Sequence, residues 1–216
     1  MVSYYRKNKA VLEIKFRMWI NRLKNPMKSK FSLTDSQLHD CILEAKKRFQ
    51  NSLEHLPDIG GSDNPMIEEF VFYSWWVVIY KCLTRYSLDS NEIGKFLYEN
   101  SVSYFKSLSK EEIDRTREKW FTEGKEQFRI CSDSKNYYPE NWKYDFVEGN
   151  GRDFDFGVNF TECAIKKYFV FQGVGELLKY VCAMDYAWSD VFGMGVSRPK
   201  SIINGDNKCV LRWKKR

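Results

Sequence analysis

The chain has 216 residues, of which 43% are hydrophobic and 17% aromatic. This composition is typical of an ordered globular protein with a substantial core and excludes a disordered chain. The net charge is +6, but the basic residues are spread along the chain, without the basic stripe or the module of a nucleic-acid-binding protein. We therefore expect no nucleic acid as a partner.

The first half of the sequence is predicted to be helical, with five helices in chain order. They are expected over residues 7–24, 32–56, from Asn64 onward, 87–108 and 109–128. Pro26 should stop the first helix. A capping signal at Thr34 opens the second helix, Asn64 should cap the third with Pro65 in its first turn, and Ser109 with Glu112 forms a capping box.

The most apolar stretch, residues 70–83, is too short to span a bilayer and is predicted to be a buried helix. We find no secretory signal at the N-terminus, so we expect a cytoplasmic protein that has no membrane partner. The six cysteines are widely spaced without a CxxC pair, and the chain has only two histidines. We expect reduced thiols, no metal site and no cofactor.

The pattern changes after residue 131, where strand-like alternation appears. Residues 142–161 are predicted to form two strands joined at Gly149–Asn150–Gly151, and a helical stretch follows over 162–192. Two final strands are expected over 197–204 and 208–215. The order β-β-α-β-β after a helical half predicts an α+β fold in which the helices pack on a small antiparallel sheet.

We therefore divide the chain into a helical lobe, residues 1–130, and an α+β lobe, residues 131–216, joined as one compact unit. The oligomeric state does not follow from the sequence.

Cys163, in the segment "NFTECAIKKYFVFQG", is the first candidate catalytic residue. With Thr161 as N-cap, Cys163 would lie in the first helical turn, where the helix dipole favours a thiolate. Lys166 and Lys167 would add positive potential. The alternative is a buried structural thiol, since free cysteine is among the most buried residue types.

Asp185 is the second candidate, because it shares a helix face with Cys182 among apolar neighbours. A carboxyl group in such surroundings has a raised pKa if it lines a cleft, which suits a general acid or base. A surface aspartate paired with a lysine is the alternative.

Two further features are candidate substrate-binding sites. Gly60 and Gly61 precede the third helix and could present N–H groups to a carboxylate, although an ordinary tight connection has the same pattern. In the last predicted strand, Cys209 and Arg212 lie on opposite faces. Arg212 could bind a substrate carboxylate or could protect a sheet edge from aggregation.

The chain resembles the L-2-amino-thiazoline-4-carboxylic acid hydrolase family. Four segments carry the resemblance: "IGGSDNPM", "FGVNFTECAIKKYFVFQGVGELLKYVCAMDYA", "GVSRPKSIINGDNKC" and "CVLRW". The resemblance implies a hydrolase that cleaves a carbon–nitrogen or carbon–sulfur bond at an amidine-like carbon, as in opening a 2-aminothiazoline carboxylate to a carbamoyl-cysteine.

The resemblance also implies roles for the candidate residues. Cys163 would attack the amidine-like carbon, and Asp185 would protonate the leaving atom and later activate water. The substrate-binding residues would be Asn159, Thr161, Gly60, Gly61, Asn64, Cys182 and Arg212. Direct attack by water, with Asp185 as base and Cys163 lining the pocket, fits the same residues.

Two other functions compete with a hydrolase. The high aromatic content also suits a domain that senses or carries a small molecule without converting it. An accessory protein of a biosynthetic pathway is the third possibility. A small molecule is the expected partner both of a hydrolase and of a sensing or carrying domain.

Overall fold

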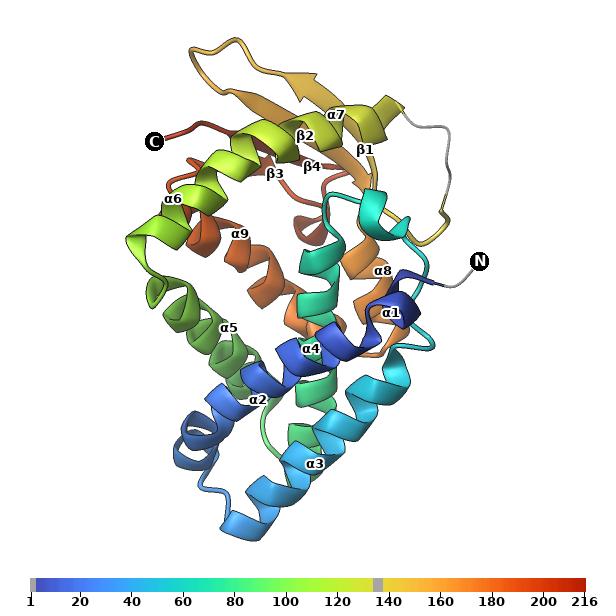
Figure 1. Cartoon of the computed structure of the whole chain (residues 1–216), viewed down its shortest axis with the longest axis vertical. Coiled ribbons are helices and arrows are strands. Elements are labelled where there is room, and N and C mark those ends of the chain that lie inside the picture. The colour runs from blue at the N-terminus through green and yellow to red at the C-terminus, as the bar shows by residue number, and fades with distance from the viewer. Residues whose placement is uncertain (1–2, 134–137) are drawn as a thin grey trace.

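The computed structural model describes residues 3–133 and 138–216, and it confirms an α+β fold with a helical N-terminal half (Figure 1). The helices are α1 (Tyr4–Lys7), α2 (Lys9–Phe31), α3 (Asp35–Ser52), α4 (Ile67–Leu83), α5 (Ser90–Lys106), α6 (Lys110–Lys119), α7 (Lys125–Asp133), α8 (Ala164–Phe171) and α9 (Leu178–Phe192). The strands are β1 (Lys143–Glu148), β2 (Phe156–Glu162), β3 (Ser197–Lys200) and β4 (Cys209–Trp213).

Helix α4 is the centre of the helical half, as its apolar sequence predicts. Most of its side chains are buried, and its neighbours include α3, α5 and α8. Figure 1 shows α4 running through the middle of the molecule, with the sheet at one end. Within the described residues, no helix is both long and apolar enough to cross a bilayer.

The first helix continues past Pro26, contrary to the sequence prediction. Helix α2 contains this proline and ends at Phe31. The reason is burial: Leu23, Met27 and Phe31 continue the apolar face of the helix into the core on both sides of the proline. The hydrophobic contacts of that face offset the lost backbone hydrogen bond of an interior proline.

The capping signals at the next helices are confirmed in two of three cases. Thr34 and Gln37 form a reciprocal capping box at α3, and Ser109 and Glu112 form one at α6. Asn64 is not the N-cap of α4, because that helix begins at Ile67. The chain instead makes a tight turn there, in which the Asn64 side chain accepts a hydrogen bond from the Met66 N–H at 2.9 Å.

The predicted helix over 109–128 is divided by a π-helical turn, Trp120–Gly124, between α6 and α7. Trp120 lies at this turn and packs edge-on against Trp188 of α9 and Trp213 of β4, with ring centroids 5.0 and 5.4 Å apart. The turn therefore joins the helical half to both the last long helix and the sheet. Aromatic edge-to-face contacts of this kind add to the stabilisation from area burial.

The sheet has the strand order β1-β2-β4-β3 in the described part of the chain, with every neighbouring pair antiparallel. In β2 the side chains of Phe156, Val158 and Phe160 are buried on the face toward the helices, and Leu211 and Trp213 of β4 continue this face. Alternation along each strand sends the intervening residues to the opposite face. This arrangement decides which side chains reach the site described below.

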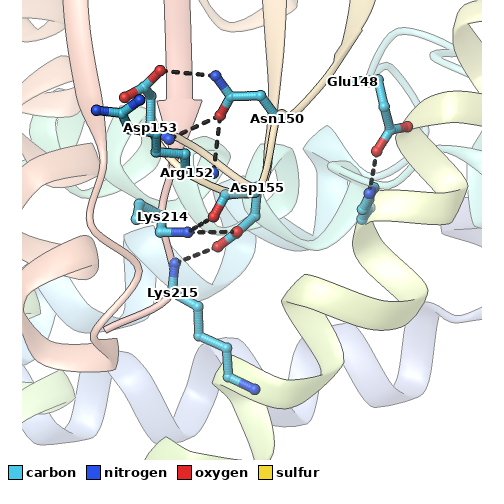
Figure 2. A network of polar contacts seen from close by, with 9 residues as sticks. Glu148, Asn150, Arg152, Asp153, Asp155, Lys214 and Lys215 are labelled. Carbon is cyan, nitrogen blue, oxygen red and sulfur yellow. Dashed lines mark hydrogen bonds and ion pairs between the residues drawn. The ribbon is translucent and has the colours of Figure 1, made fainter.

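The β1–β2 connection is tied to the C-terminal segment by polar contacts (Figure 2). The Asp155 carboxylate accepts a hydrogen bond from Lys214 Nζ at 3.0 Å and one from the Lys215 backbone N–H at 2.8 Å. Asn150 accepts hydrogen bonds from the N–H groups of Arg152 and Asp153. The predicted turn at residues 149–151 is thus one part of a longer ordered loop.

Candidate active site

A small cavity of about 70 Å³ lies between the sheet and helices α4, α8 and α9. Three of the six cysteines line it, and each comes from a different element or junction. Its chemically reactive lining consists of Glu69, Cys163, Lys166, Cys182, Asp185, Arg198 and Cys209. Residues far apart in the sequence therefore meet at one point, including both predicted catalytic residues.

Asp185 is held by an ion pair that crosses from α9 to β3. Arg198 Nη1 donates to Asp185 Oδ2 at 2.5 Å, and Arg198 Nη2 donates to the Cys182 carbonyl oxygen at 2.8 Å. The Arg198 side chain is 9% exposed, and the Asp185 side chain retains 27% because it forms part of a cavity wall. The fork geometry of the guanidinium fixes the direction of the carboxylate.

Burial raises the pKa of Asp185 above its ordinary value, to about 6, although the positive charge of Arg198 acts in the opposite direction. The carboxyl group is surrounded by protein but still reaches water through the cavity. A carboxylate that is ionised at neutral pH and takes a proton slightly below it meets the requirement for a general base.

Glu69, in the first turn of α4, is the second carboxyl group of the cavity. Burial, together with the negative charge of nearby Asp185, raises the pKa of Glu69 to about 8. Glu69 is therefore protonated at neutral pH, while Asp185 is mostly ionised. Two carboxyl groups whose surroundings push their pKa values apart can donate and accept protons at the same pH.

Cys163 is the N-cap of α8, and this corrects the prediction that Thr161 would cap the helix. Cys163 Sγ accepts a hydrogen bond from the Lys166 N–H at 3.4 Å, and the helix begins at Ala164. Thr161 belongs to β2 because the strand continues to Glu162, and its hydroxyl donates to the Lys143 carbonyl oxygen.

The prediction that the helix start favours a Cys163 thiolate is also wrong for the resting protein. Burial raises the pKa of the Cys163 thiol to about 11, which outweighs the hydrogen bonds from the helix N–H groups. Lys167 does not add the expected positive charge beside the sulfur. Its ammonium group pairs with Glu162 and donates to the carbonyl oxygens of Pro139 and Asn141.

The other two thiols of the cavity are also protonated or hydrogen-bonded. Burial, followed by the charge of Asp185, raises the pKa of Cys182 to about 12. Cys209 Sγ accepts a hydrogen bond from the Ile202 N–H at 3.2 Å. All six cysteines are free, and no group of His, Cys, Asp and Glu side chains within the described residues is arranged to hold a metal ion.

Three predicted substrate-binding residues lie elsewhere, on the opposite side of the sheet. Asn159 and Thr161 alternate with the buried residues of β2, and Arg212 alternates with Leu211 and Trp213 in β4. Arg212 Nη2 donates to Asn159 Oδ1 at 2.9 Å. None of these three side chains lines the small cavity. The prediction that Cys209 and Arg212 face opposite ways is confirmed by the same alternation.

The Gly60–Gly61 loop does not reach the small cavity either. Both glycines have positive φ, and a Cβ on them would approach Tyr138 and Tyr4 respectively. Asn64 is buried and donates to the Ile59 carbonyl oxygen at 2.6 Å and to Asn141 Oδ1 at 2.8 Å. These contacts fix the loop to its neighbours.

Two charged or titratable residues of the cavity, Glu69 and Arg198, were not predicted from the sequence. Glu69 lies four residues before buried Tyr73 in a mostly apolar helix, so helical spacing places it on a buried face. Arg198 is part of the segment "GVSRPKSIINGDNKC", but its partner is thirteen residues away on another element. Only the three-dimensional packing of β3 beside α9 shows this pair.

Comparison with protein families gives a match to the model for L-2-amino-thiazoline-4-carboxylic acid hydrolase over residues 71–213. The chain belongs to this family. The matched region contains Cys163, Cys182, Asp185, Arg198 and Cys209, and it begins two residues after Glu69. Comparison with curated proteins and with solved structures finds no match. The family resemblance stated from the sequence is thereby confirmed, and the family name indicates a hydrolase.

Proposed function

We propose that this family member hydrolyses a carbon–heteroatom bond at an amidine-like carbon of a small carboxylate substrate, for which 2-aminothiazoline-4-carboxylate is the model. The observation that carries the proposal is the meeting of Glu69, Asp185 and Cys163 in one small cavity. Such a cavity combines a general acid, a general base and a sulfur nucleophile around one reacting carbon.

Substrate binding uses the charges of the cavity wall. The amidine-like group carries a positive charge when protonated, and the Asp185 carboxylate attracts it. Lys166 supplies an ammonium group on the same wall for the substrate carboxylate. Arg198 keeps the Asp185 carboxylate in place during this binding because its guanidinium is itself fixed to the Cys182 carbonyl oxygen.

The first half-reaction forms a bond between Cys163 Sγ and the amidine-like carbon. Because the thiol is protonated at rest, Asp185 accepts its proton as the sulfur attacks. The tetrahedral adduct collapses by breaking the ring carbon–sulfur bond, and Glu69 gives its proton to the departing sulfur. The product of this step is an amidino group attached to Cys163.

Water completes the reaction in the second half. Glu69, now ionised, removes a proton from the attacking water, and Asp185 returns its proton to Cys163 Sγ as the carbon–sulfur bond to the protein breaks. The remaining proton, which the bound amidinium carried, passes to water as the carbamoyl C=O forms. The released product is a carbamoyl-cysteine, and both carboxyl groups regain their starting states. Direct attack by water, with Cys163 only lining the cavity, gives the same product from the same carboxyl pair.

The test is incubation of 2-aminothiazoline-4-carboxylate with wild type, Cys163→Ala, Asp185→Asn and Cys131→Ala, followed by mass spectrometry of the product. Cys131 does not line the small cavity, so Cys131→Ala is the control. We expect wild type and Cys131→Ala to form carbamoyl-cysteine and the other two to lose at least a hundredfold in rate.

The remaining outcomes separate the alternatives. Retained activity in Cys163→Ala with loss in Asp185→Asn would establish direct attack by water and reject the covalent step. No product from folded wild type would reject this substrate. Binding of the compound without conversion would favour the non-catalytic small-molecule-binding alternative.

A further inference from the structure

A second and much larger cavity, of about 930 Å³, adjoins the small one. Its walls come from α2, α4, α5, α6, α7, α9 and β4. The volume is within the range of ligand-binding cavities in proteins. We call it the aromatic chamber because of the residues that line it.

Eleven of the 31 residues that line the chamber are aromatic. Six of them come from distant parts of the chain: Trp19, Phe72, Trp75, Trp120, Trp188 and Trp213. Several contact one another edge-on, as Trp19 and Phe72 do with ring centroids 5.4 Å apart. An open cavity with such a wall leaves apolar surface in contact with water, which a bound apolar group would cover.

The two cavities share three lining residues, which are Glu69, Asp185 and Leu211. The carboxyl pair of the proposed reaction therefore lies at the boundary between the small cavity and the aromatic chamber. A compact cationic head group seated at the carboxyl pair would direct any substituent into the chamber. The rim of the chamber carries exposed residues of both charge signs, including Lys15, Glu68 and Lys119.

We propose that the substrate of this protein is an amidine-type compound that bears a bulky aromatic substituent, with its reactive head at the carboxyl pair and its substituent in the aromatic chamber. This inference rests on the proposed function for the identity of the head group. It extends that function by naming the class of substrate: an aryl-substituted amidine or thiazoline rather than the compact ring alone.

The binding test uses two amidines that carry the same head group, acetamidine and 4-phenylbutanamidine, with affinities measured by calorimetry. Burial of the phenyl group in an apolar chamber corresponds to about a ten- to hundredfold gain in affinity. We expect wild type to bind 4-phenylbutanamidine at least tenfold more tightly than acetamidine. Equal affinity for the two compounds would overturn the proposal.

Substitutions in the chamber make this test specific. Thr116 lines the chamber from α6, so Thr116→Trp should occupy part of it and reduce the tenfold preference. Arg115→Trp places the same side chain at an exposed neighbouring position that lines neither cavity and is the control. Met18→Trp, at a chamber residue that is 70% exposed, narrows the mouth with little risk to folding. A preference that survives in both chamber variants would contradict the proposal.

A turnover measurement separates this inference from the proposed function. We compare 2-aminothiazoline-4-carboxylate with its derivative bearing a 3-phenylpropyl group on the exocyclic nitrogen. The inference predicts a kcat/KM at least tenfold higher for the derivative in wild type but not in Thr116→Trp. Turnover of both compounds without preference would reject the aromatic substituent and leave the hydrolase. Chamber-dependent binding of 4-phenylbutanamidine without turnover of either compound would reject the hydrolase and leave the chamber as a binding site.

Discussion

Replacing Arg198 with methionine removes the cation that holds Asp185 and should destabilise the fold strongly. Methionine keeps much of the aliphatic length of the arginine side chain, so the change isolates the charge and its hydrogen bonds. Arg198 donates to Asp185 Oδ2 at 2.5 Å and to the Cys182 carbonyl oxygen at 2.8 Å. After the substitution, the carboxylate stands without a partner in a site where burial already raises its pKa.

The magnitude follows from the environment of the pair. Breaking a fully buried ion pair costs about 3–5 kcal/mol because an uncompensated charge remains. Asp185 keeps 27% of its side-chain exposure through the cavity wall, so water stabilises part of the remaining charge. We therefore expect Arg198→Met to lower the free energy of unfolding by about 2–3 kcal/mol at pH 8.

The stability loss in Arg198→Met should depend on pH through the pKa of Asp185. Without Arg198 the pKa of Asp185 in the folded protein rises further above its value in the unfolded chain. The folded state then binds the proton more tightly, so stability is present at low pH and is lost as pH rises through the folded pKa. The deficit of Arg198→Met relative to wild type should therefore shrink as the pH falls from 8 to 5.

Urea denaturation followed by tryptophan fluorescence measures these differences. The double variant Arg198→Met, Asp185→Asn removes both charges and should recover at least half of the lost stability at pH 8. If the single and double variants are equally destabilised at every pH, the ion pair does not carry the stability assigned to it. A loss below about 0.5 kcal/mol in the single variant would likewise show that the ion pair contributes little to stability.

Three further predictions follow from the structure. The pKa of Glu69 is raised to about 8 in the folded state, so wild-type stability should decline between pH 5 and 8. Glu69→Gln should flatten this decline. Urea midpoints that fall equally steeply with pH in both proteins would contradict this. Alkylation of Cys163 by iodoacetamide, followed by peptide mapping, should still accelerate between pH 8 and 10 because the thiol pKa is about 11, whereas a plateau below pH 8 would indicate a resting thiolate. Pro26→Ala should raise the free energy of unfolding by about 1–3 kcal/mol, since alanine restores the missing N–H within α2. Thermal unfolding at an unchanged or lower temperature would show that the proline does not destabilise the helix.

The fold was largely predictable because its signals are local. The capping boxes at Thr34 and Ser109, the apolar helix α4 and the alternation in β1 and β2 all appear in short stretches of sequence. The error at Pro26 has a tertiary cause, since burial of residues beyond the proline keeps α2 helical to Phe31. Local propensity does not include that packing energy.

The candidate site was only partly predictable, because its chemistry depends on packing between distant elements. Cys163, Cys182 and Asp185 were found from spacing and resemblance, and the structure brings them to one cavity. The protonated state of Cys163 could not be foreseen, since burial outweighs the helix start. Arg198 was missed because a charged residue in a short strand gives no local sign of its partner on α9.

In the proposed reaction, two carboxyl groups with separated pKa values perform the acid and base steps. The most direct test is the pH dependence of kcat/KM for 2-aminothiazoline-4-carboxylate with wild type and Glu69→Gln. We predict a bell-shaped wild-type profile with limbs near pH 6 and 8, from Asp185 and Glu69 respectively. Glu69→Gln should lose at least tenfold in rate at the optimum together with the alkaline limb. A fully active Glu69→Gln protein with both limbs intact would contradict the account.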